Sequence, residues 1–208
     1  MIATYEQRLN SDLSWALDEG SRHFEECNAV HRALRRITAR LTELGVPHAV
    51  GGGMAMFFHG FRQFTEQVEI LVARRDFPEI RRQLDGNGYF LSSEGSQYLR
   101  DAEVGVKIDF LVTGDYPGDG KPKSIAFPDP SQAVVVLKGI PCIELPTLFE
   151  LKLASGMSLP HPYRDFGDVQ QIVQVLEVPR EFATQLNPFV RAKFEELWDG
   201  VEQSRRLE

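Results

Sequence analysis

The sequence predicts an α+β fold, in which a small mixed β-sheet is flanked by helices and followed by a C-terminal helical region. Three observations lead to this prediction. Segments with the two-residue alternation of strands are concentrated between Pro47 and Leu145. Apolar stripes with helical spacing lie before and after them. A chain of 208 residues can also bury a sizeable core without a disulfide or a metal.

We expect three segments within one compact unit. Residues 1–45 form an N-terminal helical segment that packs on the core, residues 46–145 form the α/β core, and residues 146–208 form the C-terminal helical region. No internal repeat or low-complexity tract divides the chain.

Charge and composition limit the partners. The net charge of -7 argues against an extended nucleic-acid surface, because binding to a phosphate backbone draws on Lys and Arg. The only cysteines, Cys27 and Cys142, do not form a disulfide framework or a thiolate zinc site. No apolar run approaches the roughly 20 residues of a membrane span, and the N-terminus lacks the pattern of a signal peptide. We expect a cytoplasmic protein with no membrane partner.

The first element is helical from Ser11 to Leu44, with a break expected near Gly20. Its apolar positions recur in steps of three and four residues: Val30, Leu34, Ile37, Leu41 and Leu44. Gly45 stops this helix, and Pro47 prevents it from resuming.

The core begins with a short strand, "PHAV", which ends in Gly51–Gly53. "MAMFFHG" follows as about two turns of helix closed by Gly60. "EQVEILVA" is the next strand, because its apolar residues Val68, Ile70 and Val72 alternate with the residues between them.

A helix that begins after Asp76 and ends at Gly86–Gly88 separates this strand from the next pair. "YFLSSE" and "SQYLRDAE" predict paired strands around Gly95. "VKIDFLVTG" predicts a strong strand with Asp109 on the face opposite Ile108 and Phe110, and a loop rich in Pro and Gly comes after it.

Helices dominate after Leu145. Pro146 and Thr147 start the first, "YRDFGDVQQIVQVLE" contains the second, and the last helical region is interrupted at Asn187–Pro188.

The glycine cluster at the end of the first strand is a candidate phosphate site. A strand that turns through glycines into a helix offers free backbone N–H groups and the positive end of a helix dipole. Glycine also lets a phosphate approach the backbone closely. Glycine pairs serve plain tight turns as well, so this cluster by itself leaves both interpretations open.

The polar residues on two strands are candidate metal ligands. Gln67 and Glu69 are two apart and therefore share one face of their strand, and Asp109 interrupts a later apolar strand. Two carboxylates from neighbouring strands beside a glycine-rich helix start would give Mg²⁺ a pair of hard oxygen ligands.

This combination resembles the nucleotidyltransferase fold of the DNA polymerase β superfamily. It is most similar to the small bacterial members related to minimal nucleotidyltransferases and to the AbiEii type of toxin. The resemblance covers about residues 44–175. The matching features are Gly52-Gly53, Met54-Ala55, His59-Gly60, Thr65, the strand Val68–Val72, Asp109, Lys152 and the run "RDFGD" from Arg164 to Asp168.

The resemblance implies a nucleotidyltransferase-like core and a role for each matching residue. It implies catalytic positions at Gln67, Glu69 and Asp109, with Glu69 and Asp109 as the metal ligands. It implies nucleotide binding by Gly52, Gly53, Arg62, Thr65, Lys152 and Asp165. The cofactor it implies is Mg²⁺, and the ligand is an NTP or another nucleotide.

Two substitutions depart from the family pattern. Gln67 stands where the family has its first aspartate, and Glu69 stands where it has the second. Glutamine offers only a neutral carbonyl oxygen to a hard cation, and glutamate lengthens the arm by one methylene. The family's arginine before Thr65 falls on Gln63, with Arg62 beside it as a substitute.

The sequence therefore predicts a nucleotide-binding protein whose transfer of a nucleoside monophosphate is weak or lost, and to which Mg²⁺ binds poorly or not at all. Two alternatives stay open. One is an active Mg²⁺-dependent enzyme that uses Glu69 and Asp109. The other is an interaction protein of a toxin–antitoxin kind, with a protein partner.

Overall fold

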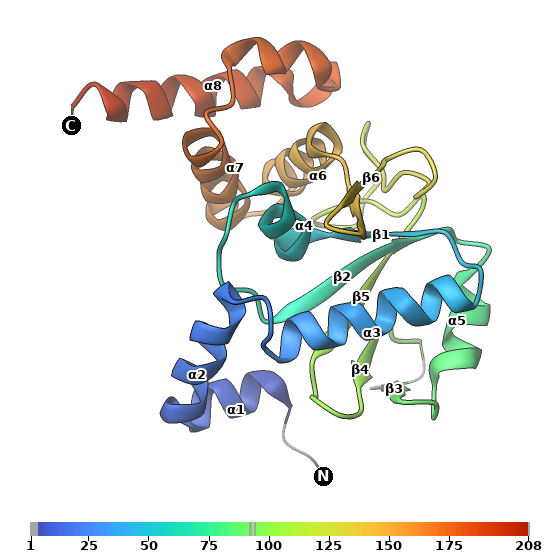
Figure 1. Cartoon of the computed structure of the whole chain (residues 1–208). Coiled ribbons are helices and arrows are strands. Elements are labelled where there is room, and N and C mark those ends of the chain that lie inside the picture. Colours follow the sequence, from blue (N-terminus) through green and yellow to red (C-terminus); the bar gives the residue numbers. More distant parts are fainter. Residues whose placement is uncertain (1–3, 92, 94, 208) are drawn as a thin grey trace.

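The computed structural model describes residues 4–91, 93 and 95–207, and it confirms the α+β prediction: a mixed seven-stranded sheet is flanked by helices (Figure 1). The strands are β1 His48–Gly51, β2 Gln67–Val72, β3 Tyr89–Leu91, β4 Tyr98–Asp101, β5 Lys107–Val112, β6 Val134–Leu137 and β7 Ile140–Ile143. The helices are α1 Tyr5–Ser11, α2 Leu13–Phe24, α3 Ala29–Glu43, α4 Gly52–His59, α5 Phe77–Leu84, α6 Leu145–Ser158, α7 Tyr163–Val175 and α8 Pro188–Arg205, with a 3₁₀ helix at Arg180–Gln185.

The sheet has the order β3-β4-β5-β2-β1-β7-β6. β1 pairs antiparallel with β2 and parallel with β7, and β2 pairs parallel with β5. The β2–β5 register places Glu69 directly beside Asp109. The centre of the sheet therefore carries the two predicted carboxylates on adjacent strands.

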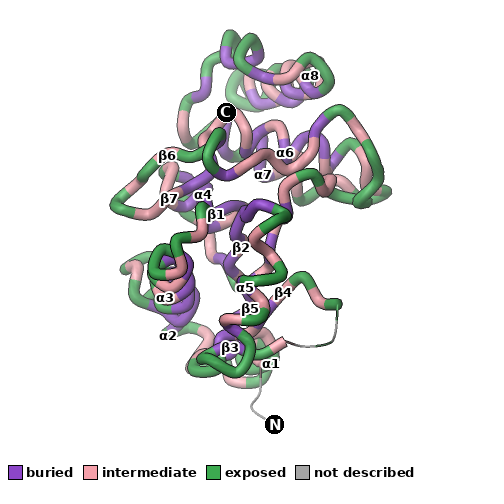
Figure 2. Tube along the Cα trace, turned by 90° about the vertical axis from the view of Figure 1, so that its right-hand side faces the viewer, coloured by how far each residue is buried: buried purple, intermediate pink, exposed green. Residues whose placement is uncertain are grey.

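One continuous core joins the three parts of the chain. It extends from Tyr5 in α1 through the sheet to Val201 in α8. Figure 2 shows the buried positions gathered along the central strands and on the inner side of α3. In Figure 1, α6, α7 and α8 lie together at one end of the sheet, with α4 between them and β1. This packing brings residues after 145 against the glycine turn that precedes α4.

The break in the N-terminal helices differs from the sequence prediction. Gly20 lies inside α2, and the chain turns at residues 25–28 instead. The buried Glu19 carboxylate accepts a hydrogen bond from the Ala29 backbone N–H (2.9 Å), and the Asn28 side chain accepts one from His31 N–H (3.1 Å). These caps satisfy the free N–H groups at the start of α3, so the turn forms where they are available.

No helix in the described part of the chain is long and apolar enough to cross a membrane.

Two buried histidines join α2 and α3 to the segment that follows α4. His23 and His31 are fully buried, and their ring centroids are 5.0 Å apart. Phe57 packs edge-on against both rings. The His23 Nε2–H donates to the Gln63 carbonyl (2.8 Å), whereas both ring nitrogens of His31 lack a partner among the described residues. Burial is the main cause that lowers the pKa of both groups; with smaller effects of His23 and Arg35, the pKa of His31 falls to about 4.

This pair predicts a loss of stability in mild acid. The folded protein holds His31 neutral, whereas the unfolded chain takes up the proton near pH 6.5, so stability is complete above that pH and declines as the pH falls towards 4. The contribution of His31 is about 3 kcal/mol. We expect His31→Phe to flatten this decline in urea unfolding measured from pH 7 to 4. His161→Gln, which changes an exposed histidine, should leave it unaltered. A wild-type slope in the His31 variant would contradict the prediction.

Candidate functional site

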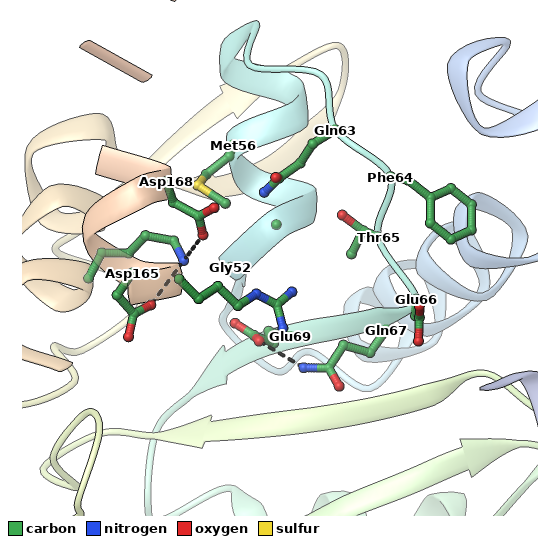
Figure 3. Close-up of a pocket in the computed structure, with 13 residues that line it drawn as sticks. Gly52, Met56, Gln63, Phe64, Thr65, Glu66, Gln67, Glu69, Asp165 and Asp168 are labelled. Atoms are coloured by element: carbon green, nitrogen blue, oxygen red, sulfur yellow. Dashed lines mark hydrogen bonds and ion pairs between the residues drawn. The ribbon is translucent and has the colours of Figure 1, made fainter. Parts of the chain in front are cut away.

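A polar cavity of about 300 Å³ opens where β2, the start of α4 and the helices α6 and α7 meet (Figure 3). Its walls come from four separate parts of the chain. The lining residues are Gly52, Gly53, Met56, Gln63, Phe64, Thr65, Glu66, Gln67, Glu69, Lys152, Arg164, Asp165 and Asp168. The cavity thus brings together all the residues for which the sequence predicted a catalytic or nucleotide-binding role, except Arg62 and Asp109.

The two glycines at the start of α4 are required by close contacts. Gly52 has a φ of +53°, and a Cβ there would lie 1.9 Å from the Glu69 carboxylate. A Cβ on Gly53 would lie 2.7 Å from the Thr65 hydroxyl oxygen. The absence of side chains therefore lets Glu69 and Thr65 approach the positive end of the α4 dipole.

Gln67 and Glu69 lie side by side on β2, as their spacing predicted. The Gln67 side-chain amide donates to the Glu69 Oε1 (3.0 Å), and Figure 3 shows this contact at the edge of the cavity. A carboxylate at position 67 would instead repel Glu69 unless a cation lay between them. Glutamine therefore satisfies the Glu69 carboxylate with a bond supplied by the protein itself.

Asp109 is adjacent to Glu69 in the sheet but is held by another partner. The Lys107 ammonium donates to the Asp109 Oδ2 (2.7 Å), and it also lies 4.6 Å from the centroid of the Tyr98 ring. Asp109 is not among the residues that line the cavity. The second predicted carboxylate is thus close to the site and paired with a neighbouring lysine.

Lys152 of α6 pairs with Asp165 and Asp168, which Figure 3 shows on the other side of the cavity from Glu69 of β2. Its ammonium donates to the Asp168 Oδ2 (2.6 Å) and the Asp165 Oδ1 (3.3 Å), and the Ser155 hydroxyl donates to the Asp165 Oδ2 (2.7 Å). Burial by itself lowers the pKa of Lys152, but Asp168 and Asp165, with a smaller effect of Glu69, outweigh it and raise that pKa. Lys152 is therefore held as a cation.

The cavity is acidic in balance. Glu66, Glu69, Asp165 and Asp168 line it, against the cations Lys152 and Arg164. In a partly buried site these charges interact more strongly than in water. An anionic ligand must therefore overcome repulsion from the carboxylates that Lys152 does not pair.

Two residues that the sequence analysis considered, Arg62 and His59, lie outside the cavity lining. Arg62 is half-exposed, and its guanidinium lies over Phe57 and 4.0 Å from Glu26, whereas its neighbour Gln63 lines the cavity. The His59 ring N–H donates to the Ile143 carbonyl (2.8 Å), which gives it a structural role. The predicted nucleotide contact of Arg62 requires a different side-chain position from the one in the structure.

The sequence analysis assigned no site role to several of the lining residues. Gln63, Phe64 and Glu66 belong to the irregular segment between α4 and β2, where no periodicity shows which side chains point inward. Arg164, which also lines the cavity, could be found from the sequence because it is the first residue of the "RDFGD" run. Glu66 is exposed at the rim, so β2 keeps the register that points Gln67 and Glu69 to the cavity.

The donor set does not fit a site for two metal ions. No group of three or more His, Cys, Asp or Glu side chains among the described residues is arranged to hold a metal. At the first family position the neutral amide of Gln67 turns its NH₂ group towards Glu69, and Asp109 is paired with Lys107. A hard divalent cation gains most from several free carboxylates, and here only Glu69 reaches the cavity from the sheet.

Structural comparison shows a nucleotidyltransferase fold. The crystal structure of ANT(2'')-Ia in complex with adenylyl-2''-tobramycin is 13% identical and has a TM-score of 0.55, covering 79% of this chain and 96% of that one. The solution structure of the same antibiotic-resistance factor is 14% identical, has a TM-score of 0.53 and covers 84% and 95%. No protein-family model and no curated protein matches the sequence.

At this level of identity the comparison establishes the fold alone, so the chemistry of the site must be inferred from its own residues. The fold of these nucleotidyltransferases is present, with a cavity at the glycine turn. The positions that would hold metal are largely satisfied from within the protein. The arrangement can offer backbone N–H groups, Thr65 and the Lys152 ammonium to a phosphate.

Proposed function

We propose that this protein binds a nucleotide in the polar cavity and transfers its nucleoside monophosphate weakly or not at all. The phosphates lie beside the start of α4, near Gly53, Thr65 and Lys152. Backbone N–H groups at a helix start and a lysine are common partners of phosphate. The complex of ANT(2'')-Ia with adenylyl-2''-tobramycin supports a nucleotide-derived ligand for this fold.

The single observation that carries the proposal is the hydrogen bond from Gln67 to Glu69. It replaces a pair of carboxylates, whose mutual repulsion a metal would relieve, by one carboxylate that is hydrogen-bonded to a neutral amide. In phosphoryl transfer, metal ions bridge the phosphates and neutralise the charge that develops on them. A site that binds metal poorly does not stabilise this developing charge, so transfer is slow. The residues that contact the phosphates, Gly53, Thr65 and Lys152, are still present, so the nucleotide still binds.

Two alternatives make different demands on the same residues. An active Mg²⁺-dependent enzyme would need Glu69 and Asp109 to hold the ion together, so Asp109 would have to leave Lys107. An interaction protein of the toxin–antitoxin kind would need no nucleotide at all. Isothermal titration with ATP, with and without Mg²⁺ or Mn²⁺, combined with transfer of a labelled nucleotide, separates the three. Binding without transfer supports the proposal, binding with transfer supports the enzyme, and no binding supports the interaction protein.

Glu69→Gln provides a sharper test, because the proposal and the enzyme predict opposite signs. The Glu69 carboxylate lies against Gly52, where a phosphate would approach. Removing one negative charge at a distance of about 5 Å should strengthen metal-free ATP binding by roughly tenfold. In a metal-dependent enzyme the same change removes a ligand and weakens binding. Titration of ATP in EDTA and in Mg²⁺ measures both, and Glu66→Gln at the rim is the matched control.

A further inference from the structure

A second cavity adjoins the polar one, and we call it the apolar chamber. Its volume is about 180 Å³, and its apolar walls are Leu111 from β5, Phe127 from the following loop, and Leu148 and Leu151 from α6. The two cavities share Gly52, Glu69, Lys152 and Asp165. One ligand can therefore extend from one cavity into the other past these four residues.

The walls of the apolar chamber are held in place by the surrounding structure. Leu148 and Leu151 are buried on the inner side of α6. The loop that carries Phe127 is closed by a hydrogen bond from the Phe127 N–H to the Asp115 carbonyl (2.8 Å). The Thr113 hydroxyl binds the Pro128 carbonyl (2.8 Å) at its base. The chamber is thus formed before any ligand arrives.

The chamber also has a polar side, where Ser155 and Asp165 lie with Glu69 and Lys152 of the shared lining. Ser155 and Asp165 meet there through a hydrogen bond of 2.7 Å between the serine hydroxyl and the Asp165 Oδ2. A carboxylate has about four lone-pair sites, and Ser155 and Lys152 use two of those on Asp165. Asp165 can therefore accept one more hydrogen bond, from an N–H donor at the end of an otherwise apolar ligand.

We infer that the apolar chamber binds the base of the nucleotide whose phosphates lie in the polar cavity, and that it favours a base with an exocyclic amine. This inference rests on the proposed function. Pockets for whole ligands usually have roughly 300–1,000 Å³, so a chamber of this size suits a single ring system. Phe127 and the leucines supply an apolar, aromatic surface for the ring, and Asp165 accepts from its amine.

Titration of the wild-type protein with ATP, UTP and inorganic tripolyphosphate in one buffer tests the inference. Burial of the base predicts that ATP binds at least about tenfold more tightly than tripolyphosphate. The amine contact predicts that ATP also binds more tightly than UTP. Equal affinity for ATP and tripolyphosphate would overturn the base site and leave the proposed function standing. Equal affinity for ATP and UTP would overturn the role of Asp165, and no binding of any of the three would overturn the proposed function itself.

Phe127→Ala supplies the matching variant. We expect it to weaken ATP binding by roughly tenfold and to leave tripolyphosphate binding unchanged, because only the ring contact is lost. Phe189→Ala on α8, which changes a partly exposed phenylalanine outside both cavities, should alter neither affinity. An equal loss for both ligands would overturn the assignment of Phe127 to the base. A thermal melt of each variant verifies folding, and the wild-type comparison decides the question if Phe127→Ala does not fold.

Discussion

The double substitution Gln67→Asp and Glu69→Asp should give the protein a site that binds divalent metal ions more tightly than the wild type does. It replaces the Gln67 amide, which now donates to Glu69, by a carboxylate on the same face of β2. Two free carboxylates beside Asp109 match the ligands that Mg²⁺ and Mn²⁺ prefer. We expect the affinity for Mn²⁺ to rise by at least about tenfold in direct titration, because changes around a metal site commonly alter affinity by 10–100-fold.

The variant should also become dependent on metal for its stability. Without metal, the two carboxylates at positions 67 and 69 repel each other, and we expect a loss of about 1–2 kcal/mol that Mn²⁺ restores by binding the folded state. Gln63→Asp adds the same charge to the same cavity but lies off the strand, so it should gain no comparable affinity. If the double variant gains none either, the alignment with the nucleotidyltransferase superfamily at these positions is incorrect.

Lys152→Met should destabilise the protein strongly. Lys152 lies between Asp165 and Asp168, and all three side chains are mostly buried. Removing one partner of a buried ion pair leaves an uncompensated charge and costs about 3 kcal/mol or more. Here two carboxylates would lose their cation, so we expect a loss of this size in urea unfolding at pH 7, together with a loss of nucleotide binding because no ammonium remains to meet the phosphates.

Two comparisons separate this effect from a general loss of charge. Lys138→Met removes a half-exposed lysine that pairs with Glu26 at the surface, and its effect should be below about 1 kcal/mol. Adding Asp165→Asn and Asp168→Asn to Lys152→Met removes the unpaired charges and should recover part of the lost stability, without recovering nucleotide binding. If Lys152→Met proves no less stable than Lys138→Met, the buried cluster does not support the fold in the way that its geometry indicates.

The local elements follow from patterns that short stretches of sequence contain. The alternation in "EQVEILVA" predicted β2 and placed Gln67 and Glu69 on one face, because side chains on a strand alternate between its faces. The glycines after "PHAV" predicted the turn into α4, because left-handed backbone and close contacts favour glycine. The break placed at Gly20 was wrong, since a partly exposed glycine is tolerated inside a helix, while the buried caps from Glu19 and Asn28 decide where α3 begins.

What the sequence by itself determined is most of the strands and helices and the residues that share a face, such as Gln67 and Glu69. Only the tertiary structure decided which of these residues meet. Lys152, Asp165 and Asp168 reach the glycine turn because one core packs α6 and α7 against β1 and α4. Asp109 pairs with Lys107, and Arg62 lies outside the cavity. The physical reason is that periodicity and turn chemistry act within a few residues, whereas contacts across the chain depend on how the whole core packs.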